Sequence, residues 1–67
     1  MKVFIIRLQD GNYLMNVRLT STYLDYDRTP DFQAAHRLND FDSRLVIQRL
    51  WNAGVKTAVR EEVTPDK

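Results

Sequence analysis

Apolar side chains alternate with polar ones along the first third of the chain and mark two strands. Residues 2–9 are rich in β-branched and aromatic side chains, and residues 13–20 place an apolar side chain at every second position. Gly11-Asn12 between them suits a two-residue type II′ hairpin loop, because glycine adopts the positive φ of the first central position. This loop predicts a register that collects the apolar side chains on one face of the ribbon. The predicted pairs are Leu8 with Met15, Ile6 with Val17, and Phe4 with Leu19.

In the second half of the chain the apolar period changes to that of a helix. Asp40 and Asp42 are candidate N-caps of this helix, and Gly54 suits the left-handed position that follows a helix. In residues 42–53 apolar side chains recur at steps of three and four residues: Val46, Ile47, Leu50 and Ala53.

The remaining segments complete one predicted domain. Residues 57–63 alternate again and predict a third strand, whereas residues 21–39 follow neither period and are expected to be irregular. Residues 64–67 are expected to form a flexible tail. Together the elements predict a single α+β domain over residues 1–67. It has a small antiparallel three-stranded sheet with one helix packed on one face, in the order ββαβ.

The small size of the chain limits how the fold can be stabilised. A domain of 67 residues removes only about 60% of its unfolded surface from water. The sequence contains no cysteine, so disulfides and thiolate metal sites are excluded. Close packing and association with a second chain remain as supports, and homodimerisation therefore stays open as an alternative.

Charge and hydropathy restrict the location of the protein. A net charge of +1 is too small for the field of the whole molecule to steer a partner strongly. No stretch approaches the ~20 apolar residues of a membrane span, and the apolar run at residues 3–6 is too short for a signal peptide. We therefore expect a cytoplasmic protein without membrane association.

The sequence offers no group of residues with the spacing of an active site. His36 is the only imidazole, and no nucleophile motif surrounds it, so we interpret it as a solvated or locally hydrogen-bonded side chain. Asp25, Asp27 and Asp31 lack the glycine and the distal glutamate of an EF-hand loop. The two glycines are already assigned to a turn and a helix end, which leaves none for a phosphate loop. We predict no catalytic residue, metal site, cofactor or enzyme activity.

The second face of the predicted sheet mixes aliphatic and guanidinium groups. In the predicted register Val3, Ile5 and Leu14 lie on this face, and one helix covers only one side of a sheet, so the face is expected to be open. It is either a solvated face or a contact surface, for which arginine is well suited. The candidate partner-binding residues, including two from the neighbouring loop, are Arg7, Arg18, Lys56, Arg60, Tyr23 and Tyr26.

Two classes of partner fit this surface. A protein is the first, with the chain acting as an inhibitor or modulator that performs no chemistry. A nucleic acid is the second, because arginines could contact phosphates while Tyr23 and Tyr26 stack on bases. The predicted open face has no aromatic platform, and acidic residues interrupt every basic cluster, which favours the protein partner.

Three stretches of the sequence resemble small uncharacterised proteins encoded by bacteriophages and prophages. They are "DGNYL" in the hairpin, "AAHRLNDFDS" leading into the helix, and "AGVKTAVREEV" in the closing strand. The matching residues are packing and capping residues, so the resemblance implies the ββαβ layout and a phage origin, and it implies no catalytic or binding residue. Small phage proteins of this kind often inhibit or modulate host proteins, which would make the host cytoplasm the expected location.

Overall fold

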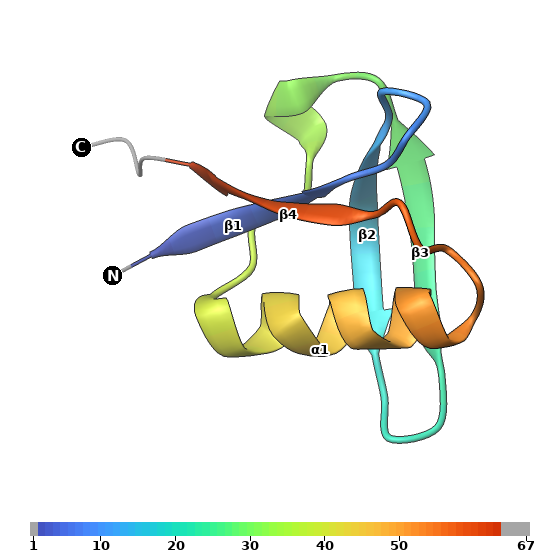
Figure 1. The fold of residues 1–67 in the computed structure, drawn as a ribbon. Coiled ribbons are helices and arrows are strands. Elements are labelled where there is room, and N and C mark those ends of the chain that lie inside the picture. Colours follow the sequence, from blue (N-terminus) through green and yellow to red (C-terminus); the bar gives the residue numbers. More distant parts are fainter. Residues whose placement is uncertain (1, 64–67) are drawn as a thin grey trace.

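The structure, a computed structural model, describes residues 2–63 and contains one α-helix and a four-stranded antiparallel sheet within them (Figure 1). The elements in chain order are β1 (Val3–Arg7), β2 (Tyr13–Leu19), β3 (Leu24–Thr29), the short 3₁₀ helix η1 (Phe32–Ala34), α1 (Asp40–Asn52) and β4 (Val59–Val63). The α+β class and the helix packed on the sheet are confirmed. The three-stranded sheet and the order ββαβ are wrong, because β3 adds a fourth strand before the helix. The strands lie in the order β3-β2-β1-β4.

β3 lies in the segment that was expected to be irregular. The chain reverses after β2 in a turn closed by Thr20, whose backbone N–H donates to the carbonyl of Tyr23 (2.9 Å). The Thr20 hydroxyl also accepts from the backbone N–H of Tyr23 (3.0 Å) and donates to its carbonyl (3.0 Å). This turn contains no glycine, proline or asparagine, and aspartate at alternate positions of β3 is unusual in strands. The usual sequence signals of a hairpin are therefore missing.

The register predicted for the first hairpin is wrong. β1 and β2 pair at Arg7 and Tyr13, and the connection between them is longer than the predicted two residues. The Asp10 carboxylate accepts from the backbone N–H of Asn12 (3.0 Å), and the N–H of Leu8 donates to the carbonyl of Asn12 (2.8 Å). An Asx turn thus replaces the type II′ loop. Gly11 does adopt the expected positive φ, at 88°.

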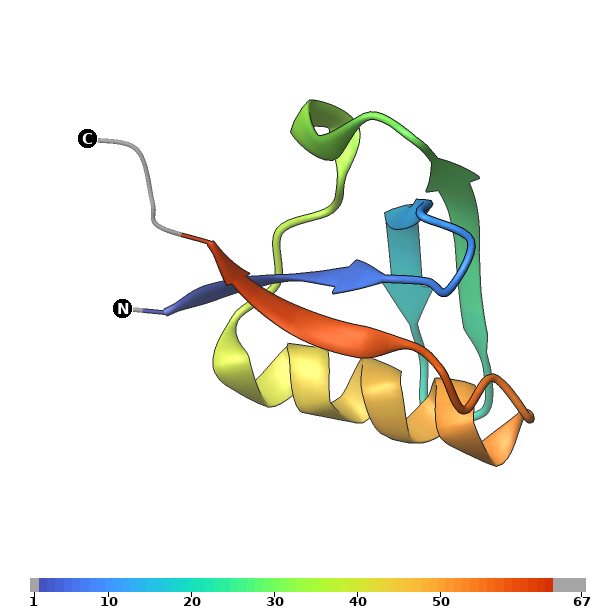
Figure 2. The same ribbon diagram turned by 45° about the horizontal axis from the view of Figure 1, so that its top comes forward.

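β1 and β2 separate beyond this pair, and another segment of the chain lies between them. The backbone groups of Phe4 and Leu38 bond to each other in both directions (2.7 and 2.8 Å). The N–H of His36 donates to the carbonyl of Leu14 (2.9 Å). Residues 35–38 therefore satisfy backbone groups that a regular hairpin would have paired internally. As a result, the β2–β3 pair runs across the β1–β4 pair (Figures 1 and 2).

The helix is close to its predicted bounds. Asn39 is the N-cap, and its side chain accepts from the N–H of Asp42 (2.6 Å), so the predicted caps Asp40 and Asp42 lie inside the first turn. Gly54, with φ 97°, follows the helix as predicted. The core between α1 and the strands consists of Ile6, Leu8, Leu14, Leu38, Val46, Ile47, Leu50 and Ala58.

The open second face of the sheet is not present as predicted. Leu14 was assigned to it, yet this residue is fully buried in the core against α1. Ile5 is also fully buried, and η1 lies on the side of β1 opposite α1 (Figures 1 and 2). The prediction gave residues 30–38 no packing role, and η1 of this segment lies on the side of β1 that was expected to be open (Figures 1 and 2).

No helix within residues 2–63 is both long enough and apolar enough to cross a membrane. The predicted tail, residues 64–67, lies outside the described residues.

Candidate functional site

The six predicted partner-binding residues do not lie on one face. Arg60 points toward the start of α1, where its Nη1 donates to Oδ1 of Asp40 (2.6 Å) and to the Ser43 hydroxyl (3.0 Å). Its guanidinium also lies 4.4 Å from the centre of the Phe4 ring. This residue holds β4 against α1 and serves the fold.

The other predicted basic residues are spread over separate elements. Arg7 is exposed on β1 and pairs with Glu61 of β4, with Nε 3.6 Å from Oε1. Arg18 is exposed on β2 and lies opposite Asp25 of β3. Lys56 is exposed between α1 and β4. A continuous basic surface is therefore not formed by these side chains.

The two predicted tyrosines do lie together. Tyr23 is 55% exposed, and Tyr26 on β3 packs partly buried against the core. Both line a hollow between β3 and the C-terminal half of α1, which we call the tyrosine hollow. Its volume is about 460 Å³, and it is lined by Thr22, Tyr23, Leu24, Tyr26, Arg49, Leu50, Asn52, Ala53 and Val55.

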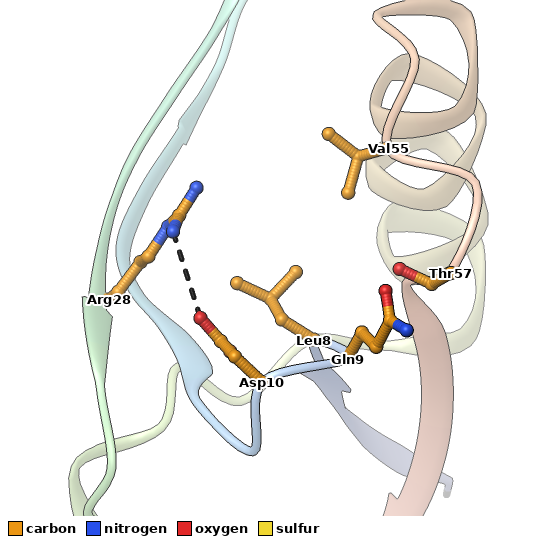
Figure 3. A pocket seen from close by; sticks show the side chains of 6 residues that line it. All are labelled: Leu8, Gln9, Asp10, Arg28, Val55 and Thr57. Carbon is orange, nitrogen blue, oxygen red and sulfur yellow. Dashed lines mark ion pairs between the residues drawn. The ribbon is translucent and has the colours of Figure 1, made fainter.

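A second hollow, which we call the Arg28 hollow, has one wall residue, Val55, in common with the first. It has a volume of about 380 Å³. Figure 3 shows Leu8 and Val55 as its apolar lining, with Arg28 and Asp10 on one side. Nη1 of Arg28 lies 3.8 Å from Oδ2 of Asp10, and both side chains are more than half exposed. Gln9 and Thr57 complete the lining with an amide and a hydroxyl.

The two hollows form one groove because of the alternation along β3. Leu24, Tyr26 and Arg28 are two residues apart, so their side chains point to the same side of the strand. The opposite wall follows the end of α1 and the loop to β4, from Arg49 to Thr57. We call this feature the β3–α1 groove.

The groove has an apolar floor and a polar rim. Leu8 and Leu50 are core residues that form part of the floor. On the rim, Nη2 of Arg49 donates to the carbonyl of Ser21 (3.2 Å), which ties the helix to the β2–β3 turn. An apolar floor with a few oriented polar groups is typical of sites that bind side chains or small organic groups.

A smaller hollow of about 240 Å³ lies beside the only histidine. Its lining includes Val17, His36 and Asp42. Nδ1 of His36 accepts from the backbone N–H of Val17 (3.2 Å), so the proton of the neutral ring is on Nε2. The Ser43 hydroxyl donates to the carbonyl of Asp40 (2.8 Å) and accepts from Nη1 of Arg60 (3.0 Å).

The Asp40 carboxylate is paired with two arginines, Arg44 and Arg60. The hydrogen bond from Arg60 holds the pKa of Asp40 below its usual value, and the nearby charge of Arg44 acts in the same direction. Residues 2–63 contain no cluster of three or more histidines or carboxylates that could hold a metal ion.

Sequence reasoning missed the arginines and Val55 as residues of the groove. Alternation of Leu24, Tyr26 and Arg28 with two aspartates was the available signal. It became informative only once β3 was recognised as a strand of its own. Comparison with protein-family models, curated proteins and solved structures gives no match for this chain.

Proposed function

We propose that this chain is a small accessory protein that binds another protein and modulates it without chemistry of its own, and that the partner docks in the β3–α1 groove. The observation that carries the proposal is the pair of adjoining hollows that share Val55, one of them lined by Tyr23 and Tyr26. A partner segment could place one side chain in each hollow.

The lining of the groove suits a protein partner. Tyrosine offers a large contact area with few rotatable bonds and a hydroxyl that can bond at the rim, and it is enriched among residues that dominate binding energy. The two guanidinium groups of Arg28 and Arg49 outnumber the single carboxylate of Asp10. We therefore expect the docking segment to be apolar with an acidic residue at its edge.

The pairing of the arginines argues against nucleic acid as the partner. Arg7, Arg28, Arg44 and Arg60 each have a carboxylate within 4 Å. Phosphate binding needs cationic groups gathered on one surface and free to replace counterions. A nucleic-acid complex would weaken steeply as salt rises, whereas the proposed complex would respond weakly to salt.

The nature of the partner rests on the resemblance to small phage proteins. We propose that the partner is a protein of the bacterial host, and that this chain acts on it in the host cytoplasm. The proposal does not require an active site, since occupying a surface of the partner is sufficient to modulate it.

Capture of partners on the immobilised full chain tests the proposal. Tyr23→Ala removes an exposed ring, and Asn52→Arg places a bulky side chain in the tyrosine hollow, so both variants should lose at least about tenfold in affinity. Phe41→Ala is the matched control, because Phe41 is 68% exposed on α1 and lines neither hollow. It should retain the same protein as the unmodified chain.

Charge reversal at Arg7 and Arg18 separates the groove from the surface first predicted from the sequence. Both side chains are exposed and lie outside the groove, so the double variant should still retain the partner. Loss of binding in this variant, with normal binding by Tyr23→Ala, would move the site to the arginines and remove the groove from the proposal.

A further inference from the structure

The free edge of β4 has a sequence that can pair with itself. β4 is the last strand of the sheet, with β1 on one side and no described strand on the other. Its residues are Val-Arg-Glu-Glu-Val, from Val59 to Val63. When two copies of this strand run antiparallel with their Glu61 residues opposite each other, Arg60 lies opposite Glu62 and Val59 lies opposite Val63.

We propose that two copies of this chain associate through the free edges of their β4 strands, which pair antiparallel with the two-fold axis at Glu61. The two sheets then join into one continuous sheet. In this register Arg60 of each copy lies directly opposite Glu62 of the other, and directly opposite residues of opposite charge stabilise an antiparallel pair.

Arg60 is already oriented for this contact. Its guanidinium is fixed by the hydrogen bonds to Asp40 and Ser43 and by the Phe4 ring, and its side chain is still 28% exposed. Arginine has five N–H donors, and the bonds to Asp40 and Ser43 both use Nη1. A carboxylate from the second copy therefore meets a group that loses little further freedom on binding.

The opposite face of the strand supplies an apolar contact. Val59 is 42% exposed, and Val63 pairs with Val3 of β1. In the proposed register Val59 of one copy extends the row formed by Val63 and Val3 of the other. Association would remove these exposed aliphatic groups from water.

Glu61 is the unfavourable position of the interface. Its two copies meet across the axis, and like charges directly opposite are destabilising. Arg7, with Nε 3.6 Å from Oε1 of Glu61, partly offsets this charge in each copy. Oε1 is buried without a hydrogen-bond partner among the described residues, whereas the Glu61 side chain as a whole is 42% exposed.

β3, the other edge strand, cannot form an equivalent pair. A two-fold antiparallel pairing brings together residues of the same face, and Arg28 lies on the opposite face from Asp25 and Asp27. No symmetric register of β3 therefore pairs its arginine with either aspartate. Of the two edge strands, β4 is therefore the one whose opposite charges face each other in a symmetric antiparallel pair. The inference is independent of the proposed function, since none of the β4 residues lines the β3–α1 groove.

Sedimentation of the full chain over a range of concentrations tests the association. We expect a species of about twice the 7.9 kDa monomer, with a dissociation constant that Glu62→Arg weakens at least about tenfold. Glu61→Gln should strengthen the dimer, because it removes the like charges at the axis. A monomer at every concentration, or a dimer unaffected by Glu62→Arg, would overturn the proposal.

Cross-linking locates the axis. The chain has no cysteine, and a residue on the axis lies opposite its own copy at a separation that a disulfide can span. Glu61→Cys should form a covalent dimer on mild oxidation. Asp25→Cys, an exposed acidic position on the other edge strand, is the matched control and should stay monomeric. Equal cross-linking by both variants, or by neither, would contradict the register.

Discussion

At the scale of single residues, His36 joins its segment of the chain to β2 at two positions. Its backbone N–H bonds to Leu14, and its ring accepts from the N–H of Val17, so one residue satisfies two positions of β2. Asn16, between these two, adopts a positive φ of 51°, and its amide donates to the Asp27 carboxylate (3.0 Å). The irregularity of β2 at this point is stabilised by polar side chains and has no hydrophobic signature in the sequence.

Removing the imidazole tests this role. His36→Ala leaves the partly buried N–H of Val17 without an acceptor, so the free energy of unfolding should fall by about 1–3 kcal/mol. Asparagine can place its side-chain oxygen near the position of Nδ1, whereas glutamine places it farther out. We therefore expect His36→Asn to recover part of the loss and His36→Gln to recover less. Urea unfolding measures all three, and equal stability of His36→Ala and the unmodified chain would refute the role.

At the scale of elements, α1 and β4 are joined by a polar network at one end and by an indole at the other. Asp40 accepts from Arg60 at the start of the helix, and Nε1 of Trp51 donates to the carbonyl of Ala58 (3.2 Å) near its end. β4 and the residue just before it are thereby bonded to α1 near both ends of the helix.

The pH dependence of stability should report the Asp40 contact. The pKa of Asp40 is lower in the folded chain than its ordinary value of 3.8, mainly because Arg60 bonds to the carboxylate. Stabilisation by a lowered carboxylate pKa is complete above the unfolded value and is lost as the pH falls through the folded value. Stability should therefore decline below pH 3.8.

Asp40→Asn is the control for this decline. The variant should be less stable near neutral pH and should lose less stability between about pH 5 and about pH 2, because it lacks the titrating group. Unfolding measured across this range would contradict the assignment if the two proteins gave parallel curves.

At the scale of the whole molecule, local signals predicted the helix and tertiary contacts decided the sheet. The end of α1 could be predicted because the left-handed glycine at Gly54 acts within one turn. The register of β1 could not, because it depends on the Asp10 side chain and on the backbone of Leu38, 34 residues along the chain from its partner Phe4.

The candidate site, like the fold, could be predicted only in part from the sequence. Tyr23 and Tyr26 were predicted from their residue type and do lie together, whereas the basic residues were grouped by a register that does not form. Arg28 and Val55 belong to the site only because β3 lies beside the end of α1. A contact between distant segments leaves no pattern of its own in either segment, so the groove could not be predicted from periodicity.

Mapping of amide chemical-shift changes is the most direct test of the β3–α1 groove as the binding site. The isotope-labelled chain would be titrated with the protein that the unmodified chain and Phe41→Ala both retain. We predict the largest changes at Tyr23, Arg28 and Val55, with little change at Arg18. Changes centred on Arg18, with none at Tyr23 or Val55, would contradict the account.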